Sequence, residues 1–245
     1  MGAMGTAVRA RATAIVVCAL VLAAAATATS QAVNAPVDNT QVIYDVYGQR
    51  LDAHDGDLLQ TPDGTIYLYG TSYGCGFQLN GPSPYCGVRV YSTRDLRTFT
   101  PAGALGGQYA FDHFDQAWQD RCTQPNFGCY RPHVVQRPYD GQYVMWVNTH
   151  GEEGYRILTS PAPGGPFTDT GAVPDLAVEP PVGGLRYGDM DLYVDTDGTG
   201  YVAYTAIWPE GNEHTIVIER LDPTLTTGTG EHVLIDAWPD RDRKS

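Results

Sequence analysis

The chain has 245 residues, with 28 Asp or Glu against 15 Lys or Arg, and a formal net charge of −13 at pH 7. This excess of negative charge repels nucleic acids and anionic membrane surfaces, so neither is an expected partner. Tyrosine and tryptophan are frequent, at 16 and 4 residues. Their flat faces and polar edges suit a neutral ligand such as a sugar, although most of them are expected to pack inside the protein.

The N-terminus has the pattern of a secretion signal. Arg9 and Arg11 are its only charges, and they precede an apolar run at 14–26 and small residues suited to cleavage. The run is too short to cross a bilayer and stop there. We therefore expect residues 1–32 to be a signal peptide, residues 33–245 to form the mature domain, and the protein to be secreted.

A hairpin pattern follows three times along the chain. Each copy has a polar opening, an apolar pair, a turn with Asp-Gly, and an alternating run of aromatic and β-branched residues. The openings lie at Asp55, Arg131 and Asp189, and the turns at 62–65, 140–141 and 195–198. Asp-Gly between such runs favours a tight hairpin turn. The Asp-Thr-Asp-Gly turn at 195–198 echoes a calcium loop, but later ligand positions are missing, so we interpret it as a turn.

The second half of each copy repeats as well. Ser92, Phe99 and Gly103 recur with the same spacing as Ser160, Phe167 and Gly171, and the third copy keeps the spacing from Glu219 to Gly230. Sheets of about four short strands at this spacing predict β-propeller blades near 51–105, 129–172 and 186–231. The expected fold class is therefore all-β, a propeller with about three blades in this chain. A β-sandwich with unrelated hairpins is the alternative.

Four cysteines remain after the signal: Cys75, Cys86, Cys122 and Cys129. An even number in an exported chain favours two disulfides, and three pairings are possible. We favour Cys75 with Cys86 and Cys122 with Cys129, because each pair closes a short local loop. A thiolate metal site is the competing interpretation, but neither spacing is Cys-x-x-Cys, so no metal is predicted.

The repeated openings resemble glycoside hydrolase family 43, five-bladed β-propellers that act on arabinose-, xylose- or galactose-containing polysaccharides. The resemblance covers roughly residues 51–230, and its repeat pattern is fairly specific. The Arg-Pro-His opening at Arg131 and the Tyr-Val-Met-Trp run that follows it look like the exo-β-1,3-galactanase branch. That branch has Glu where this chain has Tyr130 and Gly where it has Asp55, so the closer match is to members that keep the base.

The resemblance implies roles for the opening residues. Asp55 stands where the family has its general base, and Asp189 where it has the Asp that orients the general acid and raises its pKa. Inverting hydrolysis needs paired carboxylates on either side of the sugar. Arg131 is expected to hold Asp55 ionised. The family's general acid is a Glu that opens a fourth blade, and since the chain ends at Ser245, we expect a C-terminal truncation that lacks it.

Other residues are weaker site candidates. His54, Arg131 and His133 are predicted to bind substrate, although an isolated histidine is usually structural. Glu152 and Glu153 could line the cleft but fit a solvated surface better.

The predicted function is a secreted glycoside hydrolase that cleaves plant-type polysaccharides or oligosaccharides by inversion. No cofactor is predicted, although the family can hold an axial calcium or sodium ion. One alternative is a non-catalytic carbohydrate-binding propeller or an inactive fragment, and a weaker one is a structural propeller unrelated to sugars. A serine-hydrolase elbow and a phosphate-binding loop are both missing from the sequence, so those enzyme classes have no support.

Overall fold

The computed structural model describes residues 40–78, 83–123, 128–149, 154–181, 186–208 and 213–235. These all belong to one compact unit that begins at Val37. The predicted signal peptide, Glu152 and Glu153 lie outside the described residues.

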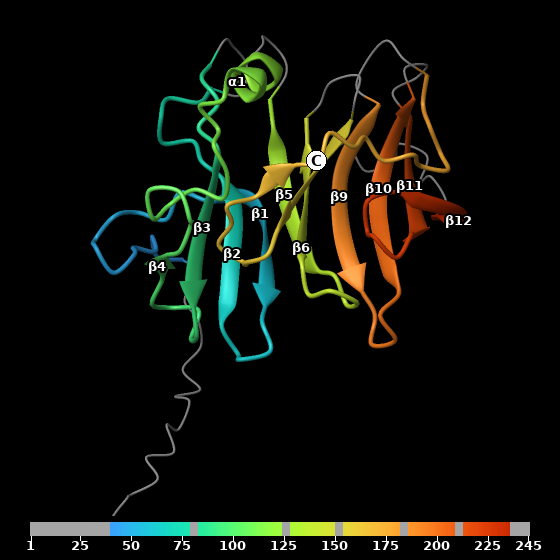
Figure 1. Ribbon diagram of the computed structural model, residues 1–245. Helices are drawn as coiled ribbons and strands as arrows, with labels where there is room; N and C mark the ends of the chain where they lie inside the picture. The colour runs from blue at the N-terminus through green and yellow to red at the C-terminus, as the bar shows by residue number, and fades with distance from the viewer. Residues whose placement is uncertain are drawn as a thin grey trace, which may run out of the picture. The chain divides into compact units, whose positions relative to one another are not determined.

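The described residues form three four-stranded antiparallel sheets, each a meander in chain order (Figure 1). Blade 1 contains β1 (His54–Gln60), β2 (Ile66–Thr71), β3 (Val88–Thr93) and β4 (Thr100–Pro101). Blade 2 contains β5 (Tyr130–Gln136), β6 (Tyr143–Asn148), β7 (Tyr155–Ser160) and β8 (Thr168–Asp169). Blade 3 contains β9 (Tyr187–Val194), β10 (Gly200–Trp208), β11 (Glu213–Leu221) and β12 (Gly228–Ile235). The predicted blades are confirmed, and sequential meanders are not the arrangement of a two-sheet sandwich.

The predicted turns are confirmed, and their glycines explain why. Gly64, Gly141 and Gly198 join the first two strands of the three blades, with φ values of 82°, 72° and 87°. Glycine adopts this left-handed conformation without steric cost, so each Asp-Gly pair reverses the chain at the place its sequence predicts.

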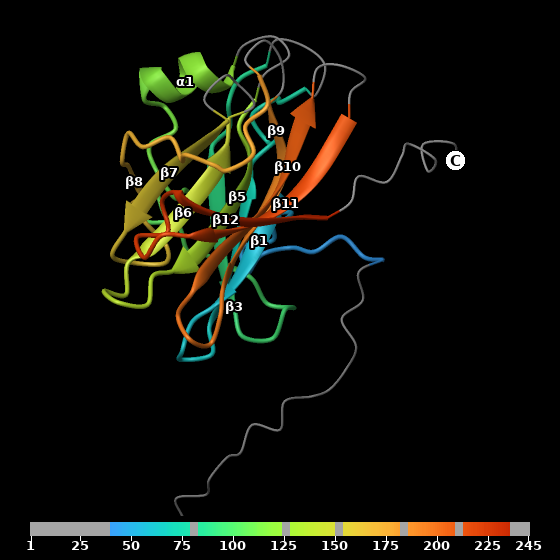
Figure 2. The same ribbon diagram turned by 90° about the vertical axis from the view of Figure 1, so that its right-hand side faces the viewer.

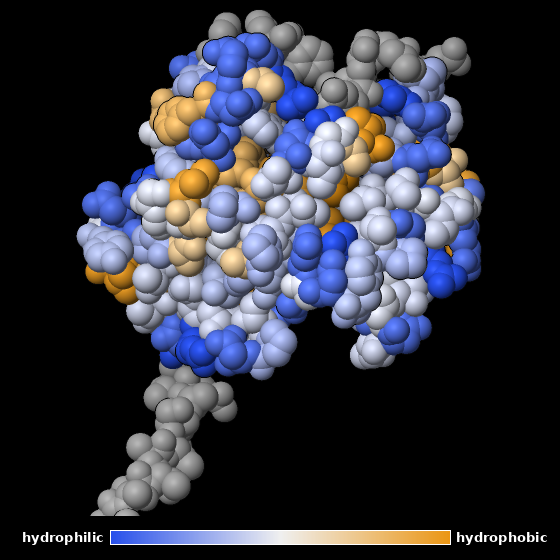
Figure 3. All heavy atoms as spheres, viewed as in Figure 1, coloured by the Kyte–Doolittle hydropathy of each residue, from blue (hydrophilic) through white to orange (hydrophobic). Residues whose placement is uncertain are grey.

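The first strand of each blade lies near the middle of the unit and the last lies toward its outside (Figures 1 and 2). One apolar core fills the space between blades 1 and 2 and a second fills the space between blades 2 and 3. Alternate residues of β6 enter different cores: Met145 and Val147 the first, Val144 and Trp146 the second. Blade 2 is therefore buried on both faces. Seen from the side of Figure 1, the surface is mostly hydrophilic, with apolar residues in separate patches (Figure 3).

The connection from blade 1 to blade 2 contains a helix that the sequence patterns did not reveal. This helix, α1 (Gln116–Cys122), begins at Asp115, whose side chain accepts a hydrogen bond from the N–H of Ala117. Its Trp118 is buried, with its ring 4.7 Å from that of Phe111. Among the described residues, no helix has the length and apolar character needed to cross a membrane.

Both favoured disulfides are present. Cys75 bonds to Cys86, and Cys122 bonds to Cys129. The first ties the segment after β2 to the start of β3, and the second ties the end of α1 to the start of β5. The first bond therefore closes most of the connection between β2 and β3, and the second closes the last part of the connection between β4 and β5.

Glu219 of β11 occupies the repeat position that Ser92 and Ser160 hold in the other blades, and it is fully buried. Its Oε2 accepts hydrogen bonds from the N–H of Ala177 at 2.8 Å and the hydroxyl of Tyr204 at 3.3 Å. Its Oε1 accepts one from the N–H of Gly230 at 3.0 Å. The carboxyl group thus joins β10, β12 and the segment that leads into blade 3.

We expect the Glu219→Ala variant to lose about 1–3 kcal/mol of unfolding free energy, because buried N–H groups would lose their acceptor. Chemical denaturation of the purified chain measures this loss. The control is Glu231→Ala, which removes an exposed carboxyl group paired with Arg220 and should change stability by less than about 1 kcal/mol. Equal effects of the two substitutions would contradict the role given to Glu219.

Candidate active site

The three inner strands bring equivalent residues of the repeat together. β5 contacts both β1 and β9. At the first repeat position these strands carry Asp55, Arg131 and Asp189, and two residues further on they carry Asp57, His133 and Asp191. The predicted opening residues are therefore neighbours in space, and the second set lies one step deeper along the same strands.

A backbone irregularity marks the opening of each inner strand. Asp55 and Arg131 have φ values of 53° and 52°, which are unusual for residues other than glycine. Both lie where the pairing register shifts, and the pairing of β9 with β10 shifts opposite Asp189. A side-chain Cβ on Gly56 would lie 1.6 Å from the carbonyl oxygen of Tyr69, so only glycine fits beside Asp55. Such bulges redirect side chains and occur often beside active sites.

Asp55 is exposed and is held by Tyr73. The Tyr73 hydroxyl donates a 2.6 Å hydrogen bond to Oδ2 of Asp55. The Tyr73 ring stacks on His54 at 4.1 Å and on Phe77 at 4.3 Å. Two rings at these distances cannot share one face, so Tyr73 lies between them. Burial, followed by the hydrogen bond to Asp55, raises the pKa of Tyr73 and keeps its hydroxyl protonated as a donor.

Arg131 connects blade 2 with blade 3. Its Nε contacts Oδ1 of Asp189, and the side chain of Asp189 is 73% exposed. Arg131 is predicted from the sequence to act as the cation beside Asp55, and in the structure it forms an ion pair with Asp189. Because β5 lies between β1 and β9, a long guanidinium side chain on β5 can reach either neighbour.

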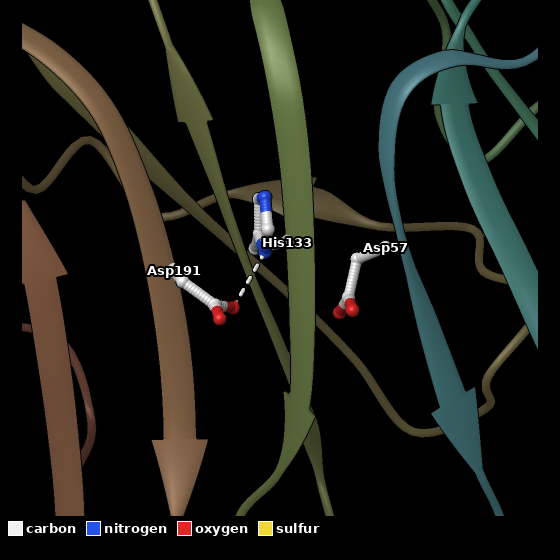
Figure 4. A group of neighbouring side chains, drawn as sticks. All are labelled: Asp57, His133 and Asp191. Carbon is white, nitrogen blue, oxygen red and sulfur yellow. Dashed lines mark hydrogen bonds and ion pairs between the residues drawn. The ribbon is translucent and has the colours of Figure 1, made fainter.

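A second cluster lies along the same strands (Figure 4). Asp57 and Asp191 point toward β5 from either side, and Nδ1 of His133 lies 3.0 Å from Oδ1 of Asp191. Oδ2 of Asp57 accepts a 3.1 Å hydrogen bond from the N–H of Val134. One ligand atom from each of the three side chains lies within 4.8 Å of the others, so together they could hold a metal ion. Two carboxylates and an imidazole are suitable ligands for a divalent cation.

Asp57 is partly buried, whereas the other aspartates of the site, Asp55, Asp189 and Asp191, are exposed. Burial raises the pKa of its carboxyl group, although the N–H of Val134 and the His133 ring act in the opposite direction. The neutral acid is therefore favoured at Asp57 more than in a solvated aspartate.

The predicted site residues divide into two groups in the structure. Asp55, Arg131, Asp189 and His133 lie on the inner strands. His54 also lies on an inner strand, at the start of β1, but its ring stacks on Tyr73 and its Nε2 lies 3.5 Å from Asp52. Asp57, Asp191 and Tyr73 are not among the site residues predicted from the sequence. Asp57 and Asp191 occupy the same repeat position as His133, so the repeat register could have identified them. No sequence pattern pointed to Tyr73.

The sequence profile of glycosyl hydrolases family 43 matches residues 49–244. This match extends over most of the chain, so the protein belongs to that family. No curated protein matches the chain.

Solved structures share the fold. A family 43 β-1,3-galactosidase with galactodeoxynojirimycin is 19% identical, with a TM-score of 0.61, over 82% of this chain and 67% of that chain. A second β-1,3-galactosidase of the family is 20% identical, with a TM-score of 0.59, over 80% of this chain and 38% of that chain. A putative exo-β-1,3-galactanase from Bifidobacterium bifidum is 20% identical, with a TM-score of 0.57, over 80% of this chain and 55% of that chain. The chain thus spans only part of these proteins, whose family forms five-bladed propellers.

We expect Asp57→Asn to raise the melting temperature at about pH 7 and to give a smaller gain near pH 4. An acid whose pKa is raised by folding contributes stability at low pH, and this contribution is lost as pH rises through the folded-state pKa. Asparagine stays neutral and keeps an acceptor for Val134.

The matched control is Asp197→Asn, because the N–H of Thr199 lowers the pKa of Asp197. This substitution should lower the melting temperature at neutral pH. Thermal unfolding followed by circular dichroism measures both variants. A gain for Asp57→Asn that does not depend on pH would contradict the burial effect.

Proposed function

We propose that this chain is the catalytic part of a secreted, inverting glycoside hydrolase that acts on β-1,3-linked galactose. The observation that carries the proposal is the placement of Asp55 and Asp189 at equivalent openings of blades 1 and 3, with Arg131 between them. The substrate class is supported by the Arg-Pro-His opening of blade 2. It is also supported by the three similar structures, two β-1,3-galactosidases and a putative exo-β-1,3-galactanase.

In this proposal Asp55 is the general base. An exposed carboxylate can accept a proton from a water molecule that attacks the anomeric carbon. The Tyr73 hydroxyl fixes the orientation of Asp55 through their 2.6 Å hydrogen bond. The other Asp55 oxygen, Oδ1, is then the atom suited to receive the proton.

In this proposal Asp189, Arg131 and His133 bind and orient the sugar. Arg131 holds the Asp189 side chain in place through their ion pair. Guanidinium and carboxylate groups at the opening also offer donors and acceptors to sugar hydroxyls. His133 lies deeper, 13% exposed and paired with Asp191, where it supports the wall below the substrate.

In the family the general acid is a Glu that opens blade four. The described residues of these three blades include no equivalent of it. Inverting hydrolysis needs that acid about 6.5–9.5 Å from the base. Binding without turnover is therefore the second candidate function. The same charged openings would hold a sugar but would not protonate the leaving oxygen.

Action outside the cell is part of the proposal. The two disulfides are of the kind that persists in oxidising compartments. The charged N-terminal pattern ahead of an apolar run supports export.

If the proposal is correct, another carboxyl group of the chain takes the place of the family's blade-four Glu. The chain then releases galactose from β-1,3-galactan, and Asp55→Asn lowers kcat by about 10²–10⁴-fold because the base is lost. Asp189→Asn should also lower kcat, and Asp197→Asn, in an exposed turn, serves as the matched control. Product release is measured by chromatography, with arabinan and arabinoxylan as comparison substrates. Release that survives Asp55→Asn would contradict the assigned base. Binding of galactan oligosaccharides without release would favour the second candidate function.

Tyr73→Phe tests the positioning of Asp55. The variant keeps the ring stack and removes the hydroxyl, so kcat should fall about tenfold or more with little change in KM. Tyr139→Phe, at an exposed tyrosine, is the control, and steady-state kinetics that separates kcat from KM is the measurement. An unchanged kcat would remove Tyr73 from the mechanism.

A further inference from the structure

A pocket of about 670 Å³ adjoins the candidate active site on blade 1. The residues of its lining that matter here are Arg50, Asp52, His54, Tyr73, Arg89 and Gln108. Its size lies within the range of about 300–1,000 Å³ that is usual for small-molecule sites. Tyr73 and His54 belong both to this lining and to the ring stack beside Asp55, so the pocket and the proposed catalytic base share a wall.

The pocket carries positive charge in an acidic protein. Two guanidinium groups, Arg50 and Arg89, line it together with a single carboxylate, Asp52. The chain as a whole has a net charge of −13. A local excess of cation in a concave site attracts anionic ligands that the rest of the surface repels.

The one carboxylate in the lining is already fully engaged. Asp52 accepts hydrogen bonds from the hydroxyl of Ser72 at 2.5 Å and from the N–H groups of Tyr73 at 2.8 Å and Gly74 at 3.1 Å. Burial raises the pKa of Asp52, but these hydrogen bonds lower it, and the net shift is downward. A Cβ on Gly74 would lie 2.7 Å from Oδ2 of Asp52, so glycine permits this close backbone approach.

Arg89 is held rigidly but is incompletely paired. Its Nη1 donates to the hydroxyl of Tyr91 at 3.3 Å, and its guanidinium lies over the ring of Tyr109 at 5.4 Å. Its Nε lies 3.7 Å from Oδ2 of Asp52 and makes no hydrogen bond. Arg89 therefore supplies a positive charge at a fixed position, and Asp52 does not occupy all of its hydrogen-bond donors.

The pocket walls are also fixed to one another. Tyr73 and Gly74 directly precede Cys75, and Arg89 follows Cys86 by three residues. The disulfide between Cys75 and Cys86 ties the two walls together. A preorganised site loses little conformational entropy when its ligand binds.

We infer that this pocket binds the carboxylate of a uronic acid residue in the glycan substrate. The inference rests on the proposed function and specifies its substrate class as an acidic galactan. Guanidinium groups match the planar geometry of a carboxylate. The imidazole of His54, whose side chain is 47% exposed, offers a flat face to the sugar ring, and the Gln108 amide offers a donor and an acceptor to its hydroxyls. Since His54 directly precedes Asp55, the uronic acid is held close to the bond that is cleaved.

Isothermal titration of the full chain with D-glucuronic acid and D-galacturonic acid tests the inference, with glucose and galactose as neutral controls. We expect a uronic acid to bind about tenfold or more tightly than its neutral counterpart and to bind less tightly as salt is raised. Arg89→Met should weaken uronate binding about tenfold. Arg50→Met, at an exposed position, should weaken it without disturbing the fold. Arg94→Met, which removes a blade 1 arginine paired with Asp63, should leave it unchanged.

The outcomes separate this inference from the proposed hydrolysis. Asp55→Asn should lower sugar release by about 10²–10⁴-fold and retain uronate binding. Equal affinity for uronic and neutral sugars, or unchanged binding in both Arg50→Met and Arg89→Met, would overturn the pocket assignment even if galactan is hydrolysed. Inorganic phosphate that binds as tightly as the uronic acids would also overturn it, because the pocket would then recognise charge alone. Uronate binding without galactan hydrolysis would leave the pocket in place and remove the proposed activity.

Discussion

The packing of β5 between β1 and β9 is the constraint on which the site depends. Blade 2 is buried on both faces, because β6 sends alternate side chains into two different apolar cores. Neither neighbouring blade can shift without opening one of these cores, and close-packed interiors resist such movement. The inner strands are therefore held at fixed positions, and their opening residues meet although they are separated by long stretches of chain.

Acidic and basic residues alternate across these openings, which reduces the repulsion between the aspartates. Blades 1 and 3 present aspartates, and blade 2, which lies between them, presents Arg131 and His133. Like charges at close range disfavour ionisation, whereas an intervening cation favours it. The ion pair of Arg131 with Asp189 and the 3.0 Å contact between His133 Nδ1 and Asp191 follow this order of residues at two successive levels. Asp57 is the exception: burial raises its pKa, so the deeper level can lower its charge by taking up a proton.

The repeat made most of the fold and part of the site predictable from sequence. Hairpin turns, blade positions and both disulfides follow from local patterns, namely Asp-Gly turns, alternating strands and short cysteine spacing. The same register predicts that Asp55, Arg131 and Asp189 converge. The sequence did not reveal the partners of these residues, because a side chain such as Arg131 can reach either neighbouring strand. It also did not reveal α1, whose seven residues carry too little periodicity to identify a helix, or the placement of Tyr73, which lies outside the repeated segments.

The stack of His54, Tyr73 and Phe77 links the candidate active site to the adjoining pocket. Tyr73 donates to Asp55 at its hydroxyl end, while its backbone N–H donates to Asp52 in the adjoining pocket. The same residue therefore positions a carboxylate in each of the two places. A ligand that binds Arg89 or displaces His54 therefore contacts the pocket wall that contains Tyr73, the residue that orients Asp55. Because the disulfide between Cys75 and Cys86 limits how far that wall can move, the pocket and the proposed base keep a fixed position relative to each other.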